Sequence, residues 1–163
     1  MKEPAWVIEA RRHIGTKEIK GSKHELKILQ WWKTIRRGGI KDDETPWCAA
    51  FVGGCLEAAG QISSRYESAK SYLTWGDSLA FPCVGAVVVF SRDGGGHVGF
   101  VVGRDKLNNI MVLGGNQGDA VNIKPFARSR VTGLRVPKGY IVPQAHYTLP
   151  LMESDGKLST NEA

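Results

Sequence analysis

The stretch PWCAAFVGGCLEAAG, residues 46–60, specifies a structural element more clearly than any other part of this chain. From Cys48 onward, apolar residues recur at the spacing i, i+3, i+4, i+7 and i+8, which predicts a buried amphipathic helix. Pro46 suits the first turn of such a helix, and Gly60 suits its end. Cys48 is therefore expected in the first helical turn, where backbone N–H groups have no intrahelical partners.

Two shorter helices are predicted before this stretch. Residues 4–14 fit a helix that begins at Pro4 and ends before Gly15. In the next helix, Ser22 and Glu25 are expected to form a capping box, and the glycines at 38–39 to end the helix. Its apolar stripe consists of Ile28, Trp31, Trp32 and Ile35. At helical spacing, paired tryptophans are more typical of a core than of a ligand platform.

After an irregular segment at 61–82, the pattern changes to that of strands. GAVVVFSR (85–92), the turn DGGG (93–96) and HVGFVVGR (97–104) predict a β-hairpin. IMVLGG (110–115) follows a turn at Asn108 and Asn109, and further strands are expected in VNIKPF and around LRVP and GYIV. Within 61–82, the expected packing residues are Tyr72, Trp75 and Phe81. The order of elements predicts an α+β fold, with N-terminal helices packed on a C-terminal antiparallel β-sheet.

Length and composition indicate a single compact domain. A chain of 163 residues with 42% hydrophobic residues can bury a sizeable core without disulfide or metal staples. We expect one catalytic domain over residues 1–150 and a polar, flexible tail over 151–163. The sequence contains no apolar run of membrane-spanning length, and its N-terminus is too polar for a signal peptide. Synthesis and initial retention in a cytosol are therefore expected.

The positive charge is concentrated at the N-terminal end. Residues 1–41 hold eleven Lys and Arg against four Asp and Glu, whereas the whole chain has a net charge of +6. Such a region attracts polyanions, which include nucleic acid, anionic lipid and anionic wall polymers. The alternative is an ordinary solvated helix face, and the sequence leaves both interpretations open.

The three cysteines lie at positions that favour different roles, either a structural thiol or a reactive thiolate. The chain has an odd number of cysteines, Cys48, Cys55 and Cys83, and none of them form a CxxC pair. This argues against a disulfide framework and against a zinc site. A buried structural thiol is the ordinary role of a free cysteine. Only Cys48 lies where the positive end of a helix favours a thiolate, so it is the candidate nucleophile.

A thiolate nucleophile needs a base, and His97 is the candidate among four histidines. It opens a predicted strand after three glycines, and strand alternation puts it on one face with Gly99, which leaves space. A third group should accept a hydrogen bond from the second ring nitrogen. Asn116 is the expected partner, and Gln117 and Asp119 remain alternatives in the same turn. Each of these polar residues also has an ordinary structural interpretation, as a core histidine or as turn residues.

Three blocks of sequence together resemble a known superfamily. DETPWCAAFVGGCLEAAG (43–60), GAVVVFSRDGGGHVGFVVG (85–103) and VLGGNQGDAVNI (112–123) resemble the NlpC/P60 and CHAP superfamily of papain-like peptidoglycan hydrolases. The closest likeness is to the small single-domain type of phages and prophages. The resemblance extends from the helix around Trp6 to about Tyr140 and implies a papain-like α+β fold.

The resemblance also implies roles for individual residues. Cys48 would be the nucleophile, His97 the general base and acid, and Asn116 the residue that orients the imidazole. The reaction would be hydrolysis of an amide bond through a thioester, without a cofactor. The loop at residues 41–44 lacks the ligand spacing of calcium-dependent relatives, so no metal is expected.

The resemblance leaves the biological role open between two enzymes. One is an endolysin, an endopeptidase or N-acetylmuramoyl-L-alanine amidase that acts on bacterial peptidoglycan after release from the host cytoplasm. The other is an antibacterial amidase effector that requires a cognate immunity protein. A different class is a basic nucleic-acid-binding module, but no RRM, KH or zinc-finger signature supports specific nucleic-acid binding. The expected partners are peptidoglycan and anionic envelope polymers, and the expected state is a monomer.

Overall fold

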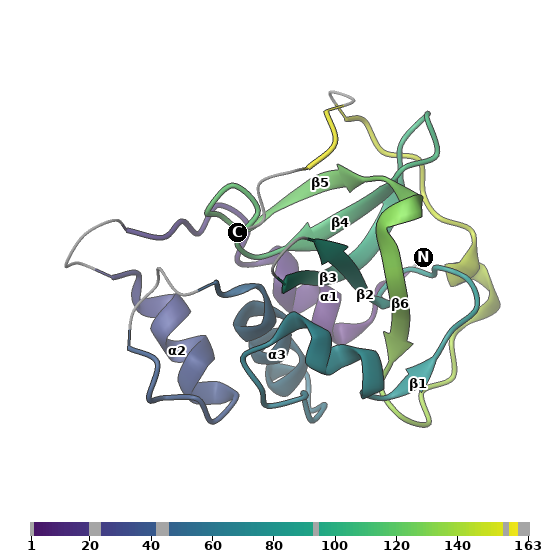
Figure 1. The fold of residues 1–163 in the computed structure, drawn as a ribbon. Coiled ribbons are helices and arrows are strands. Elements are labelled where there is room, and N and C mark those ends of the chain that lie inside the picture. Colours follow the sequence, from purple (N-terminus) through teal and green to yellow (C-terminus); the bar gives the residue numbers. More distant parts are fainter. Residues whose placement is uncertain (1, 20–23, 42–45, 93–94, 155–156, 160–163) are drawn as a thin grey trace.

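The computed structural model describes residues 2–19, 24–41, 46–92, 95–154 and 157–159. The chain forms an α+β fold in which helices lie beside a six-stranded sheet (Figure 1). The α-helices are α1 (Ala5–Arg11), α2 (Leu26–Thr34) and α3 (Cys48–Ala58). The 3₁₀ helices are η1 (Ala69–Thr74), η2 (Arg128–Arg130) and η3 (Gln144–Tyr147). The strands are β1 (Asp77–Ser78), β2 (Val87–Arg92), β3 (Gly95–Arg104), β4 (Ile110–Gly114), β5 (Asn122–Phe126) and β6 (Val131–Val136).

The sheet is antiparallel throughout, with the strand order β1-β6-β2-β3-β4-β5. The predicted hairpin is confirmed, because Val87 pairs with Phe100 and Phe90 pairs with His97. The turn at Asn108 is also confirmed, since this residue has a φ of 65° and Asp105 N–H donates to Asn109. Strand β3 lies inside the sheet, where its residues 95–100 pair with β2 and its residues 100–104 pair with β4, so each end is held by a different neighbour.

Alternate residues of the central strands face two separate hydrophobic clusters. Val98, Phe100 and Val102 of β3 pack in one cluster with the helices. Val101 lies in the other cluster, which also contains Phe126 of β5. In the described residues, no helix combines the length and the apolar character that crossing a bilayer requires.

The predicted helices are present, with shorter bounds. Helix α1 ends at Arg11, because Arg12 is its C-cap, and Ile14 beyond it is exposed. Helix α2 carries the predicted buried stripe, including Trp31 and Trp32, and of the predicted capping box only Glu25 lies in the described residues. Glu25 is itself the N-cap and accepts from Lys27 N–H. The other predicted member of that box, Ser22, lies outside the described residues, as does most of the loop at 41–44.

Two sequence predictions are wrong in the later part of the chain. Tyr72 is buried, but Phe81 is 71% exposed and packs in neither core cluster. The stretch GYIV at 139–142 is not a strand. Tyr140 N–H donates to the Pro137 carbonyl in a turn, so the segment at 139–142 does not pair in the sheet.

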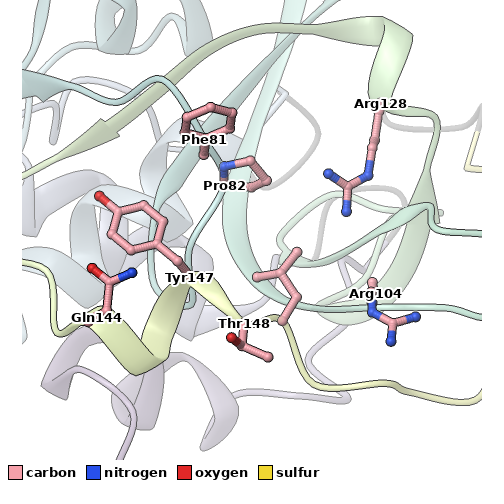
Figure 2. A pocket seen from close by; sticks show the side chains of 8 residues that line it. Phe81, Pro82, Arg104, Arg128, Gln144, Tyr147 and Thr148 are labelled. Atoms are coloured by element: carbon pink, nitrogen blue, oxygen red, sulfur yellow. The ribbon is translucent and has the colours of Figure 1, made fainter.

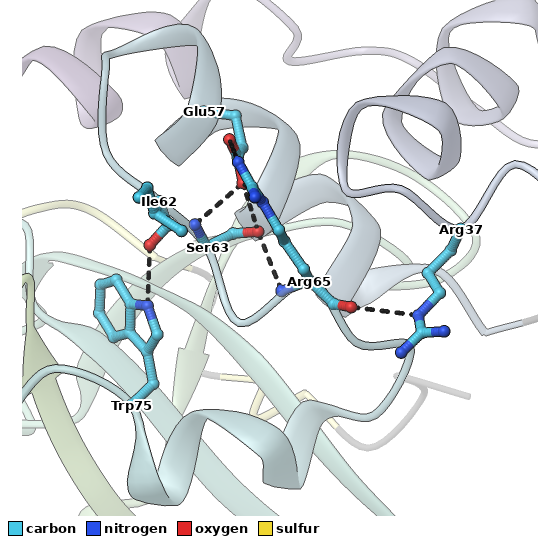
Figure 3. Close-up of polar contacts among 6 residues, drawn as sticks. All are labelled: Arg37, Glu57, Ile62, Ser63, Arg65 and Trp75. Atoms are coloured by element: carbon cyan, nitrogen blue, oxygen red, sulfur yellow. Dashed lines mark hydrogen bonds and ion pairs between the residues drawn. The ribbon is translucent and has the colours of Figure 1, made fainter.

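A polar cluster fixes the segment that leaves α3 (Figure 3). Glu57 accepts hydrogen bonds from Ser63 N–H and Oγ, at 3.0 and 2.9 Å, and from Arg65 Nε at 2.9 Å. Arg37 Nε in turn donates to the Arg65 carbonyl at 3.1 Å. The Arg65 guanidinium, followed by hydrogen bonds from Ser63, holds the pKa of Glu57 at about 2, well below its usual range. This cluster joins the ends of α2 and α3.

Glu57→Gln is expected to lower the free energy of unfolding at pH 7 by about 1–2 kcal/mol, because the charge-assisted bonds to Arg65 are lost. The depressed pKa means that the stabilisation is present above about pH 4.5 and is lost as the pH falls toward about 2. Urea denaturation at pH 7, 4 and 2.5 measures the free energy of unfolding. The difference between Glu57→Gln and the wild type should shrink as the pH falls. Glu67→Gln is the control, since the Glu67–Arg37 pair is largely solvent-exposed. A difference in the free energy of unfolding that stays constant with pH would contradict the stabilising role of the Glu57 carboxylate.

Candidate active site

Cys48 is the first residue of α3, as the sequence predicts. The preceding residue, Trp47, is the N-cap and is fully buried. Its ring stacks on Trp31 of α2 at 5.9 Å, and its indole N–H donates to Glu18 at 3.0 Å. These contacts anchor the start of α3, so the Cys48 thiol and backbone N–H hold a fixed position at the positive end of the helix.

The other two cysteines have environments that favour the neutral thiol. Cys55 and Cys83 have no exposed surface, whereas Cys48 retains 4%. Burial raises the pKa of Cys55 well above its ordinary value, and the nearby charge of Glu9 adds to this. Burial also raises the pKa of Cys83, to about 11. Because the thiolate is the reactive form, neither is suited to act as a nucleophile.

His97 lies in β3, next to its first residues, and is fully buried. Its ring is parallel to Phe126 of β5, with the centroids 5.4 Å apart, and also stacks on Phe90 of β2 at 6.3 Å. The predicted alternation is confirmed, because Val98 and Val101 face opposite clusters. The stacking restrains the plane of the imidazole, which leaves its orientation within that plane to hydrogen bonding.

Gly114 and Gly115 bring α3 and His97 to the same end of β4. A Cβ atom at Gly115 would lie 2.7 Å from both the Trp47 ring and the Phe51 Cβ atom, in the first turn of α3. A Cβ atom at Gly114 would lie 3.3 Å from His97 Nε2. Only glycines allow this approach from both sides, so the predicted base and the helix turn that carries Cys48 flank one pair of residues.

The hydrogen bond to the imidazole comes from Gln117 rather than from the expected Asn116. His97 Nε2 and Gln117 Oε1 are 3.0 Å apart, and both side chains are buried. Asn116 is buried with a φ of 60°, and its Oδ1 has no hydrogen-bond partner among the described residues. Asp119 is half-buried, and its carbonyl accepts from Glu18 N–H. The structure thus favours Gln117, one of the two alternatives that the sequence left open.

The amide of Gln117 is held in one orientation by oxygen atoms. Its Nε2 lies 3.0 Å from the Asn122 carbonyl, 2.9 Å from Asn122 Oδ1 and 3.3 Å from the Val112 carbonyl. Asn122 Nδ2 donates back to the Gln117 carbonyl at 2.8 Å. A flipped amide would place two oxygens against each other, so Oε1 must face His97.

This orientation determines the tautomer of the neutral imidazole. Because Gln117 Oε1 can only accept, His97 Nε2 must carry the hydrogen and donate it. The lone pair of the neutral ring is then on Nδ1, which is the position that can take a proton from an acid such as a thiol. The arrangement therefore provides an oriented imidazole next to Gly114, whose neighbour Gly115 packs against the first turn of α3.

Sequence reasoning did not identify Asn122. This residue is the first of β5 and lies five positions after Gln117, a spacing that indicates nothing about contact. Its role depends on the pairing of Gly114 in β4 with Asn122 in β5. This pairing brings the start of β5 back to the turn at 115–119. No local pattern in the sequence predicts that pairing.

Comparison with known families agrees with the site. The CHAP domain family matches residues 40–116, a range that includes Cys48 and His97. A comparison with curated proteins finds no match. CHAP domains are typically cysteine-dependent hydrolases of peptidoglycan, with amidase or peptidase activity. The α+β fold, with its antiparallel sheet, is consistent with this family. Residues 40–116 are therefore similar to the CHAP domain family, which is consistent with the CHAP and NlpC/P60 superfamily of peptidoglycan hydrolases.

Proposed function

We propose that this protein hydrolyses amide bonds in the peptide part of peptidoglycan, with Cys48 as nucleophile and His97 as general base and acid. The observation that carries the proposal is the buried bond between His97 Nε2 and Gln117 Oε1, next to the paired glycines at 114 and 115 that approach the first turn of α3. In this proposal Gln117, rather than Asn116, orients the imidazole. The family match to residues 40–116 supports peptidoglycan as the substrate.

The proposed reaction follows from the positions of these groups. His97 Nδ1 accepts the proton of the Cys48 thiol, and the thiolate attacks the amide carbonyl carbon. The Cys48 backbone N–H, at the start of α3, donates to the oxyanion of the tetrahedral intermediate. When the C–N bond breaks, the imidazolium gives its proton to the leaving amine. Water, deprotonated by His97, then hydrolyses the thioester and releases a carboxylic acid.

We infer an endolysin role, with synthesis in a host cytoplasm and action on the wall after release. The support is the basic N-terminal region, where Lys27, Lys33 and Arg36 on and beside α2 are exposed. Such a surface would favour approach to an anionic envelope. Mass spectrometry of digested peptidoglycan tests the activity and identifies the bond, either N-acetylmuramoyl-L-alanine or one within the stem peptide.

Cys48→Ala is expected to abolish release of soluble muropeptides and to leave the melting temperature nearly unchanged. Cys55→Ala is the matched control, because Cys55 lies two turns further along the same helix and is fully buried. It should lose about 1–2 kcal/mol of stability through a small cavity and keep its activity per folded molecule. An active Cys48→Ala variant, or an inactive but folded Cys55→Ala variant, would contradict the assignment of the nucleophile.

Gln117→Ala is expected to lower kcat by about 10-fold or more, equivalent to ~1.4 kcal/mol, with a smaller change in KM. The reason is that His97 loses the acceptor that fixes its tautomer. Asn116→Ala and Asp119→Ala, measured on the same purified peptidoglycan, should keep most of the turnover. The kcat of Asn122→Ala should lie between that of Gln117→Ala and those of the other two variants, because the amide of Gln117 can then rotate.

The rate of Cys48 alkylation by iodoacetamide separates orientation from a general loss of structure. His97→Ala should lower both alkylation and turnover, whereas Gln117→Ala should lower turnover more than alkylation. A wild-type turnover in Gln117→Ala, together with a 10-fold loss in Asn116→Ala, would return the orienting role to Asn116.

A further inference from the structure

Figure 2 shows a pocket that is lined by Arg104 and so lies at the end of β3 opposite to His97. It has a volume of about 610 Å³. Arg104, which lines it, is the last residue of β3, seven residues after His97. Seven residues of extended strand span roughly 23 Å, so the pocket is separate from the candidate active site. The lining residues are Phe81, Pro82, Arg104, Arg128, Gln144, Tyr147, Thr148 and Leu149.

The charge on this lining is positive and unbalanced. Arg104 and Arg128 line one side of the pocket, and the lining includes no acidic residue. Neither arginine forms an ion pair with a described Asp or Glu. Two guanidinium groups at one concave site favour an anionic ligand, and their planar N–H groups suit a carboxylate in particular.

Arg128 is held in place without losing its charge. Its Nε donates to the Asn108 carbonyl at 2.6 Å, and one terminal nitrogen donates to Asn108 Oδ1 at 3.1 Å. Asn108 belongs to the tight turn before β4, with a φ of 65°. The remaining N–H groups of Arg128 are available to a ligand, and the order of the side chain lowers the entropic cost of binding.

The opposite side of the pocket is aromatic and apolar. Figure 2 shows Phe81, Pro82 and Tyr147 across from the two arginines. Phe81 is 71% exposed, so its ring face is accessible to a ligand in the pocket. Gln144 and Thr148 add hydrogen-bonding groups at the rim. An aromatic face, a few polar groups and a cationic side fit a ring that carries hydroxyl groups and one carboxylate.

We propose that this pocket binds an acidic sugar of the wall glycan, a pyranose ring with a carboxylate substituent. The carboxylate lies against Arg104 and Arg128, and the apolar face of the ring lies against Phe81 and Tyr147. The identity of the glycan rests on the proposed function in the form that cuts the N-acetylmuramoyl-L-alanine bond, because that cleavage frees the lactyl carboxylate of muramic acid. The pocket would then retain the enzyme on the glycan after cleavage, at a site distinct from Cys48.

The test uses N-acetylmuramic acid as the probe and N-acetylglucosamine as its matched control, because the two differ only by the 3-O-lactyl group that carries the carboxylate. Titrations of the isotope-labelled wild-type protein, followed by amide chemical shifts, should show saturable binding of N-acetylmuramic acid in the millimolar range. The shifts should centre on Arg104, Tyr147 and Thr148. N-acetylglucosamine should bind at least about fivefold more weakly.

Variants assign the binding to the pocket. Arg128→Ala and Phe81→Ala alter exposed side chains and should each weaken binding about fivefold or more without changing the melting temperature. The control is Lys27→Ala combined with Lys33→Ala on α2, which removes two exposed charges remote from the pocket. This double variant should bind N-acetylmuramic acid as the wild type does.

Several outcomes would overturn the proposal. These are no saturable binding, equal binding of the two sugars, an equal loss in the α2 double variant, or inorganic phosphate binding as tightly as N-acetylmuramic acid. The last would make the pocket a simple anion site. Because these measurements need no turnover, binding without wall hydrolysis would reject the proposed function and retain the sugar site. Wall hydrolysis without binding of N-acetylmuramic acid would retain the proposed function and reject the sugar site.

Discussion

The contact between Gln117 and His97 is the interaction on which the proposed chemistry depends. Gln117 Oε1 faces the ring only because its amide nitrogen is surrounded by the oxygens of Val112 and Asn122. The strand pairing of β4 with β5 supplies both of these partners. These bonds link β4, the start of β5 and the turn at 115–119 to the imidazole, so the sheet, the turn and the ring are fixed relative to one another.

The paired glycines at 114 and 115 link this network to the helical layer. Larger side chains there would clash with Trp47 and Phe51 on one side and approach His97 on the other. The start of α3 is in turn anchored by the stack of Trp47 on Trp31. The N-terminal helices therefore contribute to the site indirectly, because α2 holds the residue that precedes the candidate nucleophile.

Strand β3 connects two regions of different character. One end carries His97 in a buried aromatic stack, and the other carries Arg104 at an open, positively charged pocket. The Arg104 end is covered partly by the later chain, since Met152 N–H donates to the Arg104 carbonyl and Arg104 N–H donates to that of Pro150. The ten residues of β3 separate the candidate active site from this pocket.

The sequence by itself determined the elements and the two principal candidates. Apolar spacing predicted α3 with Cys48 in its first turn, and β-branched runs predicted the hairpin with His97, because both patterns are local. The third residue needed the tertiary structure. Asn116, Gln117 and Asp119 follow paired glycines in a turn where Asn116 and Asp119 both have positive φ, and local rules do not determine where such side chains point. The return of β5 placed Asn122 against Gln117, and this long-range contact selected the partner of His97. Likewise, Phe81 looked like a core residue from its type, and only the packing of distant segments left it at the rim of a pocket.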